Sequence, residues 1–169
     1  MAYTFPTVEL TAAPSSADVN DQRYELGTIA KTEDGNVYRY VQCDVADAVD
    51  WAATSPVGYV LGGTTWECSA DFSDATSLMP VGIATATVDV SAYTDGTDTV
   101  YQWVQIGGLA SVTGHDGGIA NGKYVVWHGD GTVDEAVVGA DDVESHYIFG
   151  QVVSGGSTTA LTIVLMQTM

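Results

Sequence analysis

The residues that could form a nucleotide site lie in GGIANGK, Gly117 to Lys123, whose spacing matches the phosphate-binding pattern G-x-x-x-x-G-K. In that pattern a Ser or Thr follows the lysine to bind magnesium, and a helix follows whose N-terminus holds the phosphates. Here Tyr124 follows the lysine, and the run YVVW is typical of a strand. We therefore interpret Asn121-Gly122 as a hairpin turn, with Lys123 on the surface.

Three acidic loops could bind calcium, because carboxylates at short spacing can converge on one hard cation. None has the EF-hand spacing, so each is interpreted as a solvated loop. A cation held at a subunit boundary stays open as an alternative. The loops contain Asp95 with Asp98, Asp130 with Asp134 and Glu135, and Asp141 and Asp142 with Glu144.

The remaining reactive side chains form no recognisable catalytic group. His115, His128 and His146 are widely separated, and no nucleophile elbow G-x-S-x-G is present. Cys43 and Cys68 lack the spacing of zinc or redox sites and are expected to be buried thiols. We therefore predict no catalytic residue, no cofactor and no metal site, and a protein that is not an enzyme.

The charge balance excludes several classes of partner. The chain has 169 residues, with 22 acidic against 4 basic ones and a formal net charge of -18. Binding of nucleic acid or of anionic membranes requires clustered Lys and Arg, whereas the basic residues here are scattered singly. The start MAYTFPTVEL resembles no signal peptide, and no apolar run could span a bilayer. With 46% hydrophobic residues the chain is predicted to be globular, soluble and retained where it is made.

The aromatic residues allow two interpretations. They could stack against sugars, as in a carbohydrate-binding module. They also alternate with apolar residues inside strand-like runs, which favours a core or a subunit interface. The residues concerned are Trp51, Trp66, Trp103, Trp127, Tyr38, Tyr40, Tyr59, Tyr101 and Tyr124.

Short β-type runs separated by turn residues predict an all-β fold, a single-domain β-sandwich or β-barrel over residues 23–169. Residues 1–22 lack periodicity and are expected to form an extended N-terminal arm. Short helical turns are expected at most in 44–53 and 70–78. The expected strands are YELGTIAK, VYRYVQ, VGYVLG, TTWECS, PVGIATATV, TVYQWVQI, LASVT, KYVVWH, the pair around GDGTVDEAVV, YIFGQVV and ALTIVLMQ.

One expected strand is apolar on both faces. In YQWVQIGGLASV, residues 101–112, Val104 and Ile106 share one face with Gln102, and Tyr101 and Trp103 occupy the other. Such a strand lies at the centre of a fold, or its second face is covered by another subunit. The glycine pair at 107–108 predicts a bulge or a sharp bend.

Several segments, in this order, resemble small head-associated proteins of tailed bacteriophages. They are LGTIAKTEDGNVYRYVQ, PVGIATATV, YQWVQIGGLASV, GGIANGKYVV and YIFGQVVSGGSTTALTIVLM, and they lie within residues 26–165. The chain departs from that family in having Gln102 where glycine is common, and in a longer, more acidic turn at 93–99. The resemblance implies a capsid decoration (cement) protein or a related virion structural protein with a β-sandwich or barrel body.

The resemblance also implies partners and a location. We expect a homotrimer that binds the major capsid protein on the outer surface of the virion head, assembled in the host bacterial cytoplasm. Alternatives are another phage structural subunit, such as a tail tube or head fibre, and, from a different class, the carbohydrate-binding module. The candidate subunit-interface residues are Tyr101, Gln102, Trp103, Gly107 and Gly108, and the candidate capsid-contacting arm residues are Tyr3, Phe5, Pro6 and Val8.

Overall fold

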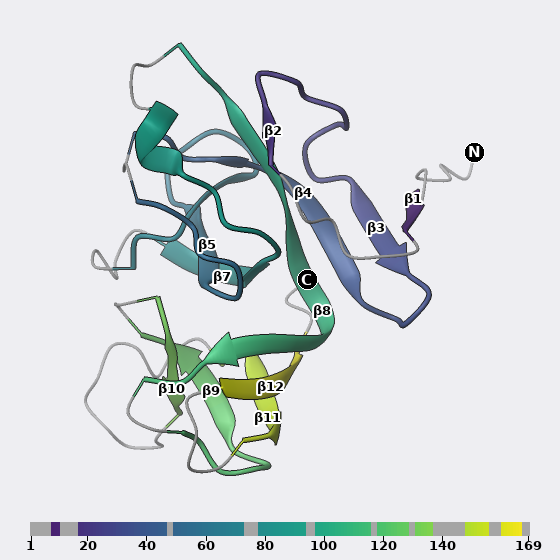
Figure 1. Ribbon diagram of the computed structural model, residues 1–169, viewed down its shortest axis with the longest axis vertical. Helices are drawn as coiled ribbons and strands as arrows, with labels where there is room; N and C mark the ends of the chain where they lie inside the picture. Colours follow the sequence, from purple (N-terminus) through teal and green to yellow (C-terminus); the bar gives the residue numbers. More distant parts are fainter. Residues whose placement is uncertain are drawn as a thin grey trace.

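The chain folds almost entirely into β-strands, as expected from its sequence (Figure 1). The computed structural model describes residues 8–10, 17–46, 49–72, 78–93, 97–115, 118–128, 131–136, 148–155 and 160–166, and for residues 8–10 and 78 it describes the backbone alone. The described helical residues form a single 3-10 turn, Val90–Tyr93. The all-β prediction is therefore confirmed, and the body contains a closed barrel.

A closed ring of five strands forms the first barrel. Its order is β4 (Val37–Cys43), β6 (Glu67–Ser69), β5 (Pro56–Val60), β7 (Leu78–Ala84) and β8 (Val100–Thr113). The ring closes because β8 also pairs antiparallel with β4. Closure leaves the backbone groups of these strands paired around the ring, which removes the open edges of a flat sheet.

The second half of β8 enters another group of strands. There it pairs with β12 (Ala160–Leu165), which is followed by β11 (Gly150–Ser154), β9 (Tyr124–Trp127) and β10 (Val133–Glu135). A single parallel bridge joins the residue after β8 to the first residue of β10. These strands therefore also curl around a core, and we call this group of strands the second barrel. β8 belongs to both barrels (Figure 1).

Three short strands cover the outside of the first barrel. β1 (Val8–Leu10) pairs parallel with β3 (Ile29–Thr32), and β3 forms an antiparallel hairpin with β4. β2 (Asp18–Val19) pairs with the start of β8. The β3–β4 turn lies between the expected strands YELGTIAK and VYRYVQ, from Glu33 to Asn36, and Gly35 within it has φ 88°.

The buried apolar residues form three clusters. The first fills the first barrel and includes Trp51 and Val104, and the second fills the second barrel and includes Trp127 and Ile163. The third lies on the outer face of the sheet that β3, β4 and β8 form, and it includes Trp103. The first half of β8 therefore separates two apolar layers.

β8 bends where the glycine pair occurs. Its register with β4 is irregular next to Gly107, and Gly108 has φ 89° and begins the pairing with β12. A Cβ on Gly108 would lie 2.1 Å from the Asn36 side-chain oxygen, so only glycine fits this close approach. The predicted bend is confirmed, but the two runs that it was expected to separate form one continuous strand.

The two expected helical turns are absent from the described residues. In 44–53, residues 47–48 lie outside the described part, Asp44 N–H donates to the Cys68 carbonyl, and Trp51 forms a bridge with Val88. In 70–78, residues 70–72 are irregular, residues 73–77 lie outside the described part and Leu78 begins β7. Pairing with distant strands overrides the weak local preference for a helical turn.

Candidate functional site

An aromatic layer covers the outer face of the first half of β8. The rings of Tyr24 and Tyr40 each lie 5.1 Å from the Trp103 ring, centroid to centroid, and Tyr40 stacks on Tyr101 at 6.0 Å. Edge-on and tilted ring pairs of this kind add to the free energy of burial. The layer fixes the segment after the arm, residues 24–26, on the outside of the barrel.

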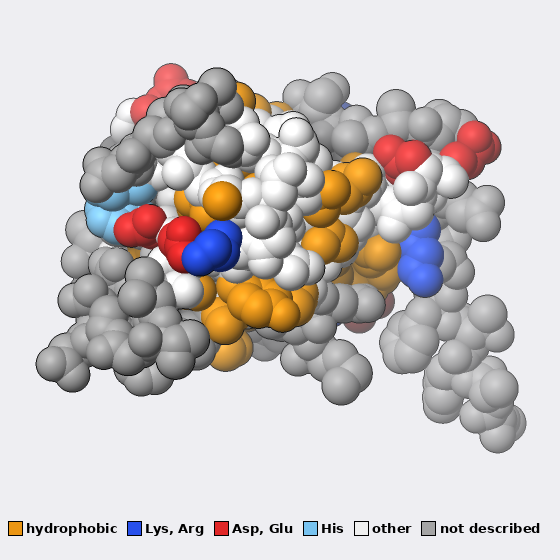
Figure 2. All heavy atoms as spheres, turned by 90° about the horizontal axis from the view of Figure 1, so that it is seen from below, with side chains coloured by type: hydrophobic (Ala, Val, Ile, Leu, Met, Phe, Trp, Pro, Cys, Tyr) orange, Lys and Arg blue, Asp and Glu red, His pale blue; other side chains and the backbone are white. Residues whose placement is uncertain are grey.

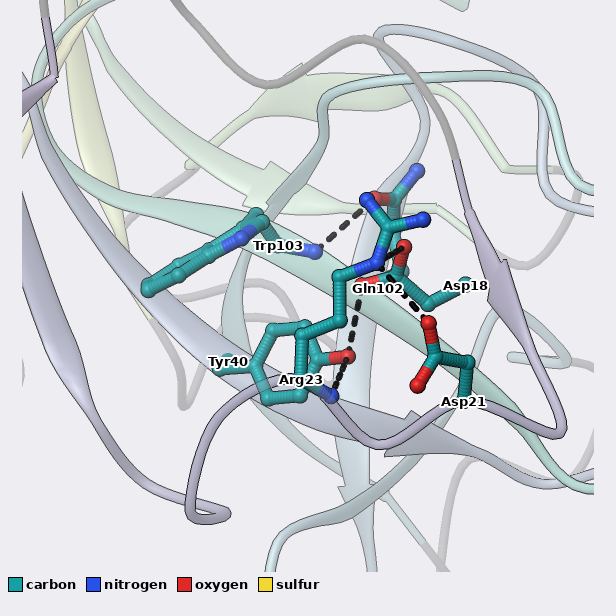
Figure 3. A network of polar contacts seen from close by, with 6 residues as sticks. All are labelled: Asp18, Asp21, Arg23, Tyr40, Gln102 and Trp103. Carbon is teal, nitrogen blue, oxygen red and sulfur yellow. Dashed lines mark hydrogen bonds and ion pairs between the residues drawn. The ribbon is translucent and has the colours of Figure 1, made fainter.

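A polar network holds the residues just before this segment, from Asp18 to Arg23 (Figure 3). The Tyr40 hydroxyl donates to the buried Asp18 carboxylate at 2.7 Å, and the Arg23 guanidinium Nε lies 3.1 Å from both Asp18 and Asp21. Burial raises the pKa of Tyr40, and the hydrogen bond to Asp18 raises it further. The chain therefore leaves the arm and joins the body at a fixed point.

Gln102 completes the hydrogen bonding of β8 at a gap between its neighbours. β7 ends at Ala84, opposite Val104, and β2 begins opposite Tyr101, so neither strand lies opposite residue 103. The Gln102 side-chain oxygen accepts the Trp103 N–H at 2.8 Å, and the Thr85 hydroxyl donates to the Trp103 carbonyl at 2.7 Å. The buried side-chain amide of Gln102 thus provides the hydrogen-bond acceptor that a neighbouring strand would otherwise have provided.

The candidate subunit-interface residues lie inside the protein itself. Gln102 is 0% exposed, Trp103 4% and Tyr101 8%. Gly107 is buried and Gly108 half-buried at the bend. The expected central position of this strand is confirmed, and its outer face is covered by Tyr24 and Leu26 of the same chain. A contact of these side chains with a second subunit stays a prediction, and it would require the covering segment to move.

The candidate capsid-contacting residues Tyr3, Phe5 and Pro6 lie outside the described residues. Val8 is described by its backbone, which pairs with Ala30 in β3. The predicted arm of residues 1–22 therefore contains two short strands, β1 and β2, which the sequence did not indicate. Both are too short for a periodic pattern, so no signal in the sequence could have shown them.

A hollow of about 220 Å³ lies beside Trp66, lined also by Tyr59, Val60, Glu67 and the two threonines before Trp66. Trp66 has φ 65°, an unfavourable conformation for a residue with a side chain. The Arg39 guanidinium lies over its ring, 4.5 Å from the centroid, and Gly27 lies so close that a Cβ there would be 2.5 Å from the indole nitrogen.

Contacts within the protein thus occupy the indole ring of Trp66. Arg39 is itself held by a hydrogen bond from its Nη1 to the Tyr59 hydroxyl, at 2.6 Å. The other three tryptophans, Trp51, Trp103 and Trp127, are buried. The interpretation of these three as core residues is confirmed, whereas Trp66 is half-buried and lines the hollow.

The two cysteines are free and buried, as predicted, and face each other in the register of β4 and β6. Burial raises the pKa of both thiols, which keeps them protonated and unreactive. Among the described residues no three His, Cys, Asp or Glu side chains converge as a metal site would require. Within the same residues no helix has the length and apolar character needed to cross a membrane.

The acidic and basic residues that were singled out have structural contacts where they are described. Asp98 accepts a hydrogen bond from Asn20, and Lys123 pairs with Glu135 at 2.6 Å. Gly122 has φ 82° in the turn before β9, as expected for Asn121-Gly122. The other residues of the three candidate calcium loops, apart from Asp134, lie outside the described part, namely Asp95, Asp130, Asp141, Asp142 and Glu144.

One pair of residues was not foreseen. The rings of His115 and His128 stack, with centroids 3.6 Å apart. They come together because His115 follows β8 and bonds through its N–H to Val133 in β10, while His128 follows β9. His146 lies outside the described residues. No spacing in the sequence could have shown this contact, since it depends on the closure of the second barrel.

Comparison with known proteins shows a similarity to the solved structure of a phage protein. No family model matches the chain, and no curated protein matches it. The chain is similar to the crystal structure of the head fibre gp8.5 N base in bacteriophage phi29, with 18% sequence identity and a TM-score of 0.48. The similarity covers 79% of this chain and 96% of the other. At this level it assigns no family.

Proposed function

We propose that the protein is a non-enzymatic virion structural protein, a decoration protein that binds the outer surface of a phage head and stabilises the lattice of the major capsid protein. The observation that carries the proposal is the ordered set of sequence segments that resemble head-associated phage proteins. Within the described residues, these segments form the β3–β4 hairpin, β7, β8, β9 and the β11–β12 hairpin. The resembling segments therefore form strands of both barrels.

The surface chemistry is compatible with such a role. A net charge of -18 keeps a protein that is made in many copies soluble and away from the packaged DNA. A decoration protein binds the assembled lattice and not its separated subunits. It therefore stabilises the lattice in proportion to the logarithm of its concentration over its dissociation constant.

The attachment of the arm supports a role in gripping a neighbour. The Asp18–Arg23 contact and the aromatic layer fix residues 18–26 on the barrel, so the preceding segment starts from a rigid base. In the proposal, Tyr3, Phe5 and Pro6 insert between capsid subunits, the copies form a trimer on the head, and β1 keeps its pairing with β3.

Binding to undecorated heads tests the proposal. Purified protein mixed with such heads should bind saturably, and electron microscopy should place it on the outer surface at fixed lattice positions. Deletion of residues 2–7 should weaken binding at least tenfold and leave the melting temperature unchanged. Lys123→Gln is the matched control, because it also removes an ion pair of an exposed basic residue but leaves the arm and its attachment unchanged.

Other outcomes would replace the proposal. Density at the tail or in isolated projections from the head would make the protein a tail or head-fibre subunit. Binding to no part of a particle would overturn a virion role altogether. Quenching of tryptophan fluorescence by oligosaccharides would support the carbohydrate-binding alternative, for which Trp66 beside its hollow is the candidate ring.

A further inference from the structure

The outer face of the second barrel carries uncharged side chains, exposed or half-buried, on four strands. Register places Leu109 beside Val164, Val164 beside Gln151, and Gln151 beside Tyr124, in one row across β8, β12, β11 and β9. Leu109 is 56% exposed and Tyr124 47%. The residues next to them along the strands fill the core, so the row must point outward.

This face extends along the strands beyond that row. Val153 and Met166 are exposed as well, and Val164 is half-buried. We call the whole set the neutral face, because all its described members are uncharged. It comprises Leu109, Ser111, Thr113, Tyr124, Gln151, Val153, Ala160, Thr162, Val164 and Met166.

In the part of the chain that the structure describes, charged groups lie at the margins of the neutral face. Lys123 and Glu135 pair beside Tyr124 at one edge. At the other edge, Asn36 accepts the Leu109 N–H at 2.9 Å, which brings the acidic β3–β4 turn alongside. Figure 2 shows this side of the molecule, with hydrophobic and uncharged side chains across the middle and charged side chains to either side.

We infer that the neutral face is where one copy of this protein contacts another. The distribution of charge favours a second copy as the partner. A partner with a basic surface would bind to the acidic surface outside the neutral face. A second copy carries the same net charge of -18 and is repelled from that remainder. Two copies can meet with few opposed carboxylates at the neutral face, because its described members are uncharged. An apolar centre with a charged rim is also the usual arrangement of a protein–protein interface.

The size of the face sets the strength of the contact. Four strands spaced about 4.8 Å apart and about five residues long cover roughly 300 Å² in projection. A stable interface buries about 800 Å² on each partner. The neutral face therefore forms the centre of a weak contact that depends on protein concentration. Salt should strengthen the contact, because it screens the repulsion between the acidic surfaces.

Sedimentation velocity of the purified protein tests the inference without any capsid. We expect association over roughly micromolar to millimolar concentrations, stronger at high salt than at low salt. Leu109→Glu and Val153→Glu should each raise the dissociation constant at least tenfold. The matched control is Leu61→Glu, because Leu61 is 57% exposed but lies beyond β5 of the first barrel, and it should leave association unchanged.

The result can overturn the inference in three ways. The first is a protein that stays monomeric at every concentration and salt. The second is an equal change of the dissociation constant in Leu61→Glu and Leu109→Glu. The third is an unchanged dissociation constant in Leu109→Glu at an unchanged melting temperature. If the monomeric protein binds heads and Leu109→Glu abolishes that binding, the face contacts the capsid instead. The proposed function would then survive while the self-contact would not.

Discussion

The two halves of β8 differ in what covers them. From Val100 to Gly107 every residue is buried, whereas from Leu109 to Thr113 buried and exposed residues alternate. The first half has the barrel core on one face and the aromatic layer on the other, while the second half has a core on one face and open surface on the other. One strand thus contains a part that is buried on both faces and a part that is buried on one face only.

The difference explains where polar groups occur in the molecule. The first barrel buries Gln102, Asp18 and two cysteines, and each polar group there needs a defined arrangement of neighbours. None of the buried polar or charged residues in the described part of the chain belongs to β9, β10, β11 or β12, and the buried polar atom of the second core is the indole nitrogen of Trp127. The first barrel is therefore specified by many contacts, and the second leaves a face available for assembly.

The largest expected effect is that of removing the centre of the aromatic layer. Trp103→Ala should lower the free energy of unfolding by about 3–5 kcal/mol, because it leaves a cavity among Tyr24, Tyr40 and Tyr101. Chemical denaturation measures the change. Thr113→Ala, at the exposed end of the same strand, should change it by less than about 0.5 kcal/mol. Similar values for the two variants would contradict the difference between the halves of β8.

The bend that joins the halves should be the next most sensitive position. Gly108→Ala should cost more than about 2 kcal/mol, since it combines a positive φ with an overlap at Asn36. Gly122→Ala has φ 82° but meets no atom within 4 Å, so it reports the backbone term alone. Thermal melts of both variants separate the two terms. Equal losses would show that the contact with Asn36 contributes nothing.

Two glutamines test whether the polar groups of the two barrels differ in importance. Gln102→Ala should cost about 1–3 kcal/mol, because it leaves the buried Trp103 N–H without its partner. Gln151→Ala removes an exposed hydrogen bond to the Gly122 carbonyl and should cost less than about 1 kcal/mol. Urea titration of both variants provides the comparison. A larger loss for Gln151→Ala would reverse the expected order.

Alkaline pH should act on the first barrel. Burial raises the pKa of Cys43, Cys68 and Tyr40 above their values in an unfolded chain, so their contribution is complete at neutral pH and is lost as the pH rises. From about pH 8.5 upward the unfolded cysteines ionise, and each should lower stability by about 1.4 kcal/mol per pH unit.

Denaturation at pH 7 to 10 measures this slope. Cys43→Ala should reduce it by one group, whereas Val153→Ala on the neutral face should leave it unchanged. A stability that stays constant up to pH 10 would mean that these thiols are not buried as described.

Much of the strand framework could be predicted from the sequence, because period-2 runs and turn residues act locally. The hairpin at 33–36 and the bend at 107–108 follow from residues that tolerate positive φ. The short strands β1 and β2 could not be predicted, since two or three residues carry no period. The helical turns expected in 44–53 and 70–78 were wrong where described, because distant pairing outweighed local preference.

The sequence by itself determined the composition of the surface and of the core. An acidic excess with scattered bases repels nucleic acid, and the alternation of apolar residues requires a buried face in each strand. The apolar character of both faces of 101–106 was also visible. These properties depend on residue type and spacing, which are local.

The tertiary structure alone decided what lies against each face. Tyr24 and Leu26 pack over the cluster that contains Tyr101 and Trp103, and a gap between β7 and β2 gives Gln102 its hydrogen bond. The neutral face likewise exists because register aligns uncharged residues from four separate strands. Such juxtapositions depend on long-range pairing, and no local pattern specifies which strand becomes the neighbour of another.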